Sequence, residues 1–505
     1  MEDKKTQGWR LASEYKNLPG IFYREVEATK FPKPELVLYN KELARILEIE
    51  EETELLSCKE KAELFSGRRL PRGASPIAQA YAGHQFGYFT MLGDGRAMLI
   101  GEQVLSTGER YDIQLKGSGR TAFSRGGDGK ATLGPMFREY LISEFMAALK
   151  IPTTRSLAVV TTGERVWRGG FLQGAVLTRA AQSHIRVGTF QYASMGGKEN
   201  IEALTAYTIE RHHPHLKHVE AKDRYRSFLR EIVRKQADLI ANWQSVGFVH
   251  GVMNTDNMAL SGETIDYGPC AFMDEYDPKT VFSSIDSQGR YRYENQPRMA
   301  EWNLERFAET LLPLLAQDEK EAIEIANAEI SQFQVLYKKV WMERMLKKLG
   351  IVENVDGDEE IVEELLSVMK KTKADYTNTF VRLSLEEGGK DGSYLEGTRS
   401  LFADAGFSAW RKKWKNRLVA QAKRIRTKEG EVSFASTMMR EVNPWLTARN
   451  FRVEEVLENA VKEDMEGFCE FLEVLKRPYD YDGMNSKYQE LSKTSMEGYR
   501  TFCGT

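Results

Sequence analysis

The sequence predicts an α+β protein with two lobes, because a strand-rich half of the chain precedes a helix-rich half. Between residues 88 and 180, short apolar segments alternate with glycine-containing turns, which is typical of antiparallel strands. From about residue 220 onward, apolar residues recur at spacings of three and four, which is typical of amphipathic helices. Strands and helices that are segregated along the chain in this way favour the α+β class.

The strand-rich half predicts three strands and one helix. FGYFTMLGDGRAMLIGEQV (86–104) predicts two strands that a turn at 93–95 joins, and RYDIQLKG (110–117) predicts the third. A glycine-rich stretch (117–135) follows. The next segment, 136–150, predicts an amphipathic helix, because its apolar residues recur every three or four positions. The helix-rich half then predicts long helices over 223–248, 300–316 and 319–349.

Composition and charge argue against several classes of function. The net charge of the 505 residues is −3, which provides no positive field for nucleic acid or an anionic membrane. No apolar run approaches about 18 residues, and MEDKKTQGWR has no apolar core, so we expect neither a transmembrane helix nor a secretory signal. The four cysteines are far apart, which excludes a cysteine zinc site and favours a reducing, cytoplasmic location.

The stretch HGVMNTDNMALSGETIDYG (250–268) resembles the catalytic strip of a kinase with one residue missing. His250 and Asn257 keep the separation of the kinase pattern His-x-Asp-x-x-x-x-Asn, and Asp266 begins the later Asp-x-Gly triplet. Val252 stands where the catalytic aspartate belongs. The strip is compatible with an inactive kinase, with a kinase whose base has moved, or with an enzyme that uses ATP differently.

Three side chains of this strip suit metal-assisted phosphate chemistry. Asn257 and Asp266 offer oxygen ligands of the kind that magnesium prefers. Asp256 neighbours Asn257 and is available as the base that Val252 cannot provide, although a turn or capping aspartate is the alternative. We expect His250 to brace the loop rather than to take part in chemistry.

A lysine and a glutamate upstream complete a kinase-like order along the chain. Lys116 ends a predicted strand, and Glu139 follows 23 residues later on the predicted helix. In kinases, a strand lysine that a helix glutamate orients binds phosphate. The alternative is a solvated lysine and an exposed glutamate, but the order Lys, helix Glu, His…Asn, Asp-x-Gly favours the pairing.

Two glycine-containing turns are suited to contacts with phosphates or a nucleotide. Gly93, Gly95 and Arg96 combine backbone amides with a guanidinium, although GDGR alone is also a common turn. Asp128 and Gly129 lie in the glycine-rich stretch, in a loop that can fold over a nucleotide. The same stretch lacks the glycine spacing and the hydroxyl residue of a Walker loop.

Two arginines lie seven residues apart in LTRAAQSHIRVGTF (177–190). The planar forks of Arg179 and Arg186 fit phosphate oxygens. Arginines that form structural ion pairs or lie on the surface are the alternative.

Together these segments resemble the selenoprotein O family (SelO; YdiU in bacteria). The resemblance rests on YAGHQFG, GDGRAMLIGEQ, QLKGSGRTAFSRGGDGKATLGPMFREYLISE, LTRAAQSHIRVGTF, HGVMNTDNM and DYGPCAFMDEYDP. It extends through YRYENQP and NPWLTARN, so it covers essentially the whole chain. It implies a protein-kinase-like fold with two lobes (86–180 and 181–330), an N-terminal extension (1–85) and a helical C-terminal extension (331–505).

The resemblance also implies the transfer of AMP from ATP to Ser, Thr or Tyr hydroxyls of proteins, with the nucleotide flipped relative to kinases. It implies Asp256 as the proton acceptor, and Lys116, oriented by Glu139, as a phosphate contact. It implies that Asn257 and Asp266 bind Mg²⁺, with Mn²⁺ as the alternative metal. ATP and acceptor proteins are the expected partners, without nucleic acid or membrane. Nucleotide contacts are implied for Gly93, Gly95, Arg96, Lys116, Asp128, Gly129, Arg179, Arg186 and Asp266.

The C-terminus departs from the eukaryotic members of this family, which carry Cys-x-x-Sec near the end. This chain has Arg500 and Cys503 at those places, so a local redox pair is absent. A link between Cys503 and Cys270 is a further hypothesis. From the residues alone, a phosphotransferase with Asp256 as its base and a non-catalytic ATP-binding scaffold both stay open.

Overall fold

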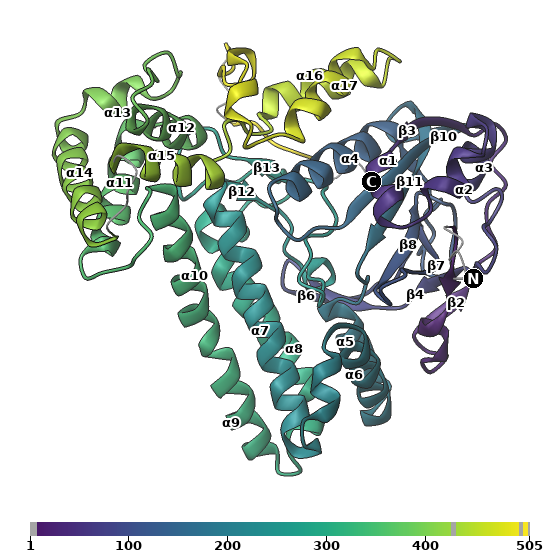
Figure 1. Cartoon of the computed structure of the whole chain (residues 1–505). Helices are drawn as coiled ribbons and strands as arrows, with labels where there is room; N and C mark the ends of the chain where they lie inside the picture. Colours follow the sequence, from purple (N-terminus) through teal and green to yellow (C-terminus); the bar gives the residue numbers. More distant parts are fainter. Residues whose placement is uncertain (1–7, 426–430, 494–497, 503–505) are drawn as a thin grey trace, which may run out of the picture.

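The computed structural model describes residues 8–425, 431–493 and 498–502. A large antiparallel sheet forms one side of the molecule, and the long helices within 221–348 extend away from it (Figure 1). The helices within 450–475 return to the sheet and pack on the helix Leu133–Ala148. The mixture of a single large sheet with separate helices confirms the predicted α+β class.

The main sheet contains nine strands within the described residues, and all of its ladders are antiparallel. The strand order is β2-β4-β7-β8-β11-β10-β3, with β1 on β7 and β9 on β11. The bounds are β1 (Leu11–Ala12), β2 (Tyr23–Glu25), β3 (Glu35–Tyr39), β4 (Ile77–Gln79), β7 (Ala97–Val104), β8 (Arg110–Lys116), β9 (Ala131–Thr132), β10 (Arg155–Trp167) and β11 (Phe171–Ala181).

Apolar side chains alternate between the two faces of this sheet, and helices cover both faces. Leu99 and Leu177 pack in the cluster that includes the apolar residues of α4 (Leu133–Ala148). The neighbouring Met98 and Val176 pack on the opposite side, in the cluster that includes three short helices. These helices are α1 (Lys41–Ile46), α2 (Glu50–Glu54) and α3 (Cys58–Phe65).

The three predicted strands are present as β6 (Tyr88–Met91), β7 and β8, and the predicted helix over 136–150 is α4. β6 does not pair with β7, however; it pairs with β5 (Ala82–Gln85) in a separate two-stranded sheet. Strands on both sides of residue 85 share the main sheet. The division of the chain at that residue therefore stays a prediction.

The predicted helix over 319–349 is wrong in one respect, because it is divided at Ser331. The segment contains neither glycine nor proline, so the sequence gives no local signal for the break. Both pieces pack on α7, but only the first packs extensively on α8, so tertiary packing accounts for the division. These helices are α7 (Ala221–Ser245), α8 (Gln296–Leu315), α9 (Glu319–Ile330) and α10 (Gln332–Lys348).

A two-residue ladder brings the two ends of the strip 250–268 together, just after the end of α7. β12 (Phe248–Val249) pairs with β13 (Ala271–Phe272), so the segment between them returns to its starting point. None of the described helices is long and apolar enough to span a membrane. The remaining helices are α5 (Val187–Met195), α6 (Lys198–His212), α11 (Asp358–Thr372), α12 (Tyr376–Glu387), α13 (Arg399–Ala403), α14 (Ala405–Ile425), α15 (Glu431–Val442), α16 (Asn450–Ala460) and α17 (Glu466–Leu475).

Candidate functional site

A cavity of about 570 Å³ lies between the edge of the main sheet and the strip that follows α7. Segments from four separate regions of the sequence meet there: the turn before β7, the glycine-rich loop, the end of β11 and the strip itself. Every predicted site residue except Glu139 lines this cavity. These residues are Gly93, Gly95, Arg96, Lys116, Asp128, Gly129, Arg179, Arg186, Asp256, Asn257 and Asp266.

Lys116 and Glu139 form a buried ion pair behind the cavity wall. Lys116 is the last residue of β8, and Glu139 lies one helical turn or more into α4, which packs against β10 and β11. Their charged atoms, Nζ and Oε2, are 2.6 Å apart, and the two residues are only 6% and 3% exposed. The lysine also donates to Oδ1 of Asp266 at 2.8 Å. Its ammonium is therefore fixed at the cavity surface by two carboxylates.

Arg179 joins the same cluster from β11. Its Nη1 donates to Oδ1 of Asp266 at 2.7 Å and to Oε1 of Glu139 at 3.1 Å, and its Nε donates to Oε1 of Gln114 at 2.8 Å. Lys116, Arg179 and Arg186 hold the pKa of Asp266 well below its ordinary value, against the opposing effect of burial. Asp266 has a φ of 63°, in the left-handed region that few non-glycine residues adopt. This conformation turns the carboxylate towards the three cations.

Arg186 is a buried guanidinium with an unused donor. It is 2% exposed, its Nη1 donates to the backbone oxygen of Asp256 at 3.0 Å, and its Nε donates to that of His184 at 3.2 Å. The guanidinium stacks on Tyr81, with 4.4 Å between Cζ and the ring centroid. Its Nη2 is buried and has no hydrogen-bond partner among the described residues. A buried donor of this kind is stabilised when an anion enters the cavity.

Asp256 presents a carboxylate to the same cavity without an ion pair among the described residues. It lies in the single 3₁₀ turn Thr255–Asn257 and is 7% exposed. Oδ2 accepts a long hydrogen bond of 3.5 Å from Gln85, while Oδ1 is buried and has no partner within the described chain. Burial raises the pKa of Asp256 to about 6, although Arg186 acts in the opposite direction. A carboxylate with this pKa is mostly ionised at neutral pH and is able to accept a proton.

Two polar residues keep the strip in place. His250 is fully buried, its Nε2 lies 2.9 Å from the backbone oxygen of Ile265, and its ring stacks on Trp243. Burial lowers the pKa of His250. Asn257 donates from Nδ2 to the backbone oxygen of Val252 at 3.0 Å, so its amide nitrogen is used within the loop. Oδ1 of Asn257 is then the atom that can serve as a ligand.

The glycines of the two predicted turns are required by packing of the loops on each other. At Gly93, where φ is 126°, a Cβ atom would lie 2.4 Å from the ring of Phe123. At Gly129, where φ is 68°, a Cβ atom would lie 2.1 Å from the backbone oxygen of Gly119. The contact of Gly93 holds the glycine-rich loop against the turn before β7, and that of Gly129 closes the glycine-rich loop on itself. Both loops line the cavity.

Asp128 has a strong partner that the sequence did not indicate. Arg168 binds both of its carboxylate oxygens, at 2.8 and 2.9 Å, and the backbone nitrogen of Lys130 donates to Oδ1 at 3.0 Å. The hydrogen bonds from Arg168 lower the pKa of Asp128 to about 2. In this structure the carboxylate therefore stabilises the loop.

Sequence reasoning missed Asp94 as a member of the site. This carboxylate is 3% exposed and accepts hydrogen bonds from the backbone nitrogen of Gln79 and from Nε2 of Gln114, both at 3.1 Å. Burial raises the pKa of Asp94 to about 6. Since Gln114 also contacts Arg179, Asp94 links the turn before β7 to the cation cluster. Its position between two predicted glycines was the available signal, but its partners lie 15 and 20 residues away in the sequence.

The donor set fits a hard cation only in part. Asn257 and Asp266 supply one amide and one carboxylate, and magnesium commonly takes few protein ligands, with water and phosphate oxygens completing the shell. No group of three or more His, Cys, Asp or Glu residues suited to a metal occurs in the described part of the chain. A metal at this place would therefore depend on the oxygens of a bound phosphate.

Of the two cysteines in the hypothetical link, Cys270 and Cys503, the structure describes only Cys270. Cys270 is buried next to β13, whereas Cys503 lies outside the described residues.

Comparisons with known proteins agree with the resemblance of the sequence. Residues 8–476 match the family described as protein adenylyltransferase SelO. The protein nucleotidyltransferase YdiU of a Bacillus cereus strain is 53% identical over 509 residues, which cover all of both chains. The protein of the same name from Bacillus thuringiensis is 53% identical over 502 residues, and that from Clostridium beijerinckii is 51% identical over 503 residues, each covering 99% of both chains.

Proposed function

Because the chain belongs to the family described as protein adenylyltransferase SelO, we propose that it transfers AMP from ATP to Ser, Thr or Tyr hydroxyls of acceptor proteins. Apart from family membership, one observation on the structure supports this proposal. Asp256, a buried carboxylate with one oxygen that has no hydrogen-bond partner among the described residues, lines the same cavity as Lys116, Arg179 and Arg186. A base and a set of phosphate-binding cations thus share one space.

The cation cluster supplies the electrostatic part of the reaction. The cations of Lys116, Arg179 and Arg186 exceed the carboxylates of Glu139 and Asp266 by one positive charge. Positioned cations in a site that excludes water stabilise the charge that develops on a leaving pyrophosphate. Arg96 and the glycine-rich loop, with Asp128 and Gly129, are proposed as further nucleotide contacts; Gly93 and Gly95 shape the opposite turn.

Asn257 and Asp266 are proposed to hold Mg²⁺, with Mn²⁺ as the alternative. The ion would neutralise phosphate oxygens when a nucleotide is bound. The protein itself orients both ligands, since Asn257 is fixed by the backbone of Val252 and Asp266 by Lys116 and Arg179.

Asp256 is proposed to accept the proton of the acceptor hydroxyl. The hydroxyl oxygen attacks the α-phosphorus of ATP, and a new phosphoester bond forms. The bond from the α-phosphorus to the oxygen that bridges to the β-phosphorus breaks, so pyrophosphate leaves. The proton passes to Asp256, whose pKa of about 6 suits this role near neutral pH.

We also propose that the fold is protein-kinase-like, with lobes over 86–180 and 181–330 and extensions over 1–85 and 331–505. Three features support it: a lysine on a sheet strand, a glutamate on the helix that covers this sheet, and a His…Asn loop followed by Asp-x-Gly. Val252 then marks the loss of the usual base position, and Asp256 its replacement four residues later.

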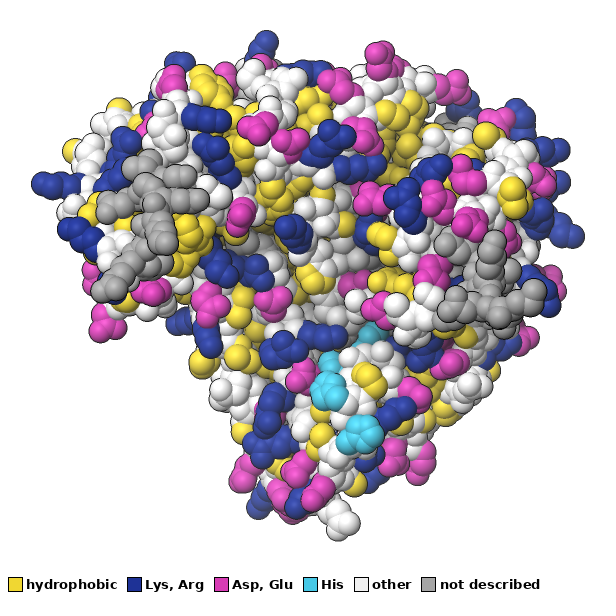
Figure 2. Space-filling view, viewed as in Figure 1, with side chains coloured by type: hydrophobic (Ala, Val, Ile, Leu, Met, Phe, Trp, Pro, Cys, Tyr) yellow, Lys and Arg dark blue, Asp and Glu magenta, His cyan; other side chains and the backbone are white. Residues whose placement is uncertain are grey.

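The proposed partners are ATP and acceptor proteins, without nucleic acid or membrane. Acidic and basic side chains are interspersed over the face shown in Figure 2, and no large basic surface dominates it. Such a surface lacks the electrostatic footprint of nucleic-acid binding. The widely spaced cysteines support the proposal of a cytoplasmic location.

A phosphotransferase is the second candidate, because the strip resembles a kinase loop and Asp256 would serve as its base equally well. The test uses a generic acceptor protein, magnesium, and ATP labelled on either the α- or the γ-phosphate. AMP transfer labels the acceptor from the α-position only. Label from the γ-position only would refute the proposal in favour of a kinase, and ATP binding without any transfer would favour a scaffold. Asp266→Ala is the control that should abolish a genuine signal.

A further inference from the structure

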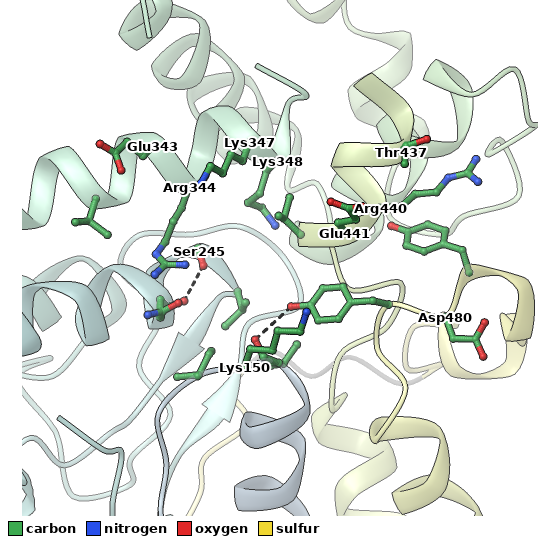
Figure 3. Close-up of a pocket in the computed structure, with 18 of the residues that line it drawn as sticks. Lys150, Ser245, Glu343, Arg344, Lys347, Lys348, Thr437, Arg440, Glu441 and Asp480 are labelled. Carbon is green, nitrogen blue, oxygen red and sulfur yellow. Dashed lines mark hydrogen bonds between the residues drawn. The ribbon is translucent and has the colours of Figure 1, made fainter. Parts of the chain in front are cut away.

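A second cavity, of about 930 Å³, lies apart from the nucleotide cavity and is lined by none of the predicted site residues. It forms where the end of α4 meets the last turns of α7, α10 and α15 and the segment 479–482 (Figure 3). Two lysines from distant parts of the sequence enter it. Lys150 follows α4, and Lys348 is the last residue of α10.

Lys348 is a buried cation that no carboxylate neutralises. It is 3% exposed, and its Nζ lies 4.1 Å from the ring centroid of Phe380 and 5.5 Å from that of Tyr376. Its ammonium forms neither a hydrogen bond nor an ion pair with any part of the chain that the structure describes. Burial lowers the pKa of Lys348 to about 7. A buried ammonium is costly without a counter-charge, so an anion in the cavity would stabilise its charged form.

The acidic residues around the cavity do not supply this counter-charge. Asp238 pairs with Arg344 at 2.9 Å, and Asp480 accepts a hydrogen bond from the backbone nitrogen of Gly483. The carboxylates of Glu343 and Asp480 point away from the space in front of Lys348 (Figure 3). Within the described residues, Lys348 pairs with none of the acidic side chains that line the cavity: Asp238, Glu343, Glu441, Asp480 and Asp482.

Lys150 approaches the same space from the opposite side (Figure 3). Its Nζ lies 5.6 Å from the ring centroid of Tyr479, and it forms no ion pair with the described residues. Lys347 and Arg440 add positive charge to the rim, and Nε of Arg440 is buried without a hydrogen-bond partner among the described residues. The ammonium groups of Lys348 and Lys150 and Nε of Arg440 are therefore donors at this space without a hydrogen-bond partner among the described residues.

We propose that this cavity binds a small phosphate-bearing anion between Lys348 and Lys150, at a site separate from the nucleotide cavity. Phosphate is favoured because two flexible ammonium groups act as point charges, which suit a compact oxyanion, whereas planar carboxylates are matched best by the fork of an arginine. The cavity volume lies within the range of small-molecule sites, about 300 to 1,000 Å³. Tyr376 and Phe380 shield the buried ammonium of Lys348 from water, whereas Lys150 is exposed and lies beside Tyr479.

The test follows the acetylation of Lys348 in the full chain at pH 7.5, by mass spectrometry of its peptide. The added probes are inorganic phosphate and pyrophosphate without divalent metal, citrate as the carboxylate arm, and sodium chloride at equal ionic strength. We expect pyrophosphate to slow acetylation of Lys348 at least fivefold and that of the exposed Lys222 not at all. Lys150→Met should raise the half-protecting concentration at least threefold, and because Lys150 is exposed this variant should fold.

A second measurement does not depend on labelling. Phosphate and pyrophosphate should raise the Tm of the wild type more than that of Lys150→Met, because an anion that binds the native state stabilises it. Equal Tm responses together with no selective protection of Lys348 would overturn the site. Protection by citrate that equals or exceeds protection by pyrophosphate would overturn the phosphate class. Since neither readout requires AMP transfer, failure here is distinguishable from failure of the proposed function.

Discussion

Replacing Asp256 with asparagine should remove the base while keeping the shape of the site. General base catalysis contributes about 10²- to 10⁴-fold to a rate, which corresponds to about 3 to 5 kcal/mol of activation free energy. We therefore expect kcat of Asp256→Asn to fall by at least about 10²-fold. ATP affinity should be unchanged or higher, because the carboxylate forms no ion pair with Lys116, Arg179 or Arg186 and its removal takes a negative charge out of the cavity.

The pH dependence gives the sharper readout. A carboxyl group with a pKa of about 6 is roughly nine-tenths ionised at pH 7 and one-tenth ionised at pH 5. The rate of the wild-type protein should therefore fall about tenfold between these pH values, since only the ionised form accepts a proton. Gln85→Leu should move this acid limb to higher pH, because the hydrogen bond from Gln85 lowers the pKa of Asp256. Initial rates of AMP incorporation from α-labelled ATP, from pH 5 to pH 8, measure both effects.

Asp94 provides a matched control. It is also a buried carboxylate at the cavity, and burial also raises its pKa to about 6. Its Oδ2 already accepts hydrogen bonds from both Gln79 and Gln114, so it is not expected to accept the hydroxyl proton. If the acid limb persists in Asp256→Asn but disappears in Asp94→Asn, the base has been assigned to the wrong residue. Parallel losses of ATP binding and turnover in Asp256→Asn would also refute the assignment.

Three further predictions test the surroundings of the site. Lys116→Met should lower the affinity for ATP, measured by calorimetry, at least tenfold. An unchanged affinity would show that Lys116 only neutralises Glu139 and does not bind the nucleotide. Glu263 lies in the strip 250–268, is buried, and accepts a hydrogen bond from the backbone nitrogen of Gln182 at 2.9 Å. Burial raises the pKa of Glu263 to about 7, so its ionisation disfavours folding as pH rises. Glu263→Gln should therefore stabilise the protein at pH 8 by up to about 3 kcal/mol, and not below pH 4, as measured by thermal unfolding at both pH values. Gly129→Ala should raise the KM for ATP several-fold, with circular dichroism confirming the fold, because its Cβ atom would collide with Gly119; an unchanged KM would exclude the loop from nucleotide binding.

Local patterns were sufficient for the strands and helices that carry the cation cluster. The alternation in 110–117 predicted the strand that ends at Lys116, and the spacing of apolar residues predicted the helix that carries Glu139. The alternation of a strand and the three-to-four spacing of a helix both repeat within a few residues, so one sequence without homologues is enough to recognise them. The resulting contact between Lys116 and Glu139 required only that the helix pack on the sheet.

Contacts between distant segments were not predictable in the same way. The backbone nitrogen of His84 donates to the hydroxyl of Thr255 across 171 residues, and this contact fixes the β5–β6 sheet above Asp256. The ion pair between Asp128 and Arg168 crosses 40 residues. Neither pair has a periodicity or a motif that marks it. Such contacts depend on how loops pack after the sheet and helices have formed.

The charge balance of the cluster explains how the protein tolerates three buried cations at the proposed nucleotide cavity. Three cations in a buried site would repel one another and lose hydration, at a cost of several kcal/mol for each unpaired charge. Glu139 and Asp266 neutralise two of them, and Asp266 is bonded to both Lys116 and Arg179. Arg186 keeps one unpaired donor within the described structure, so the excess positive charge faces the cavity. Asp94, Asp128 and Asp256 add three carboxylates to the lining of the cavity, but Arg96, Arg125, Lys130 and Arg168 add four cations. The lining therefore keeps a net attraction for the phosphates of the proposed nucleotide.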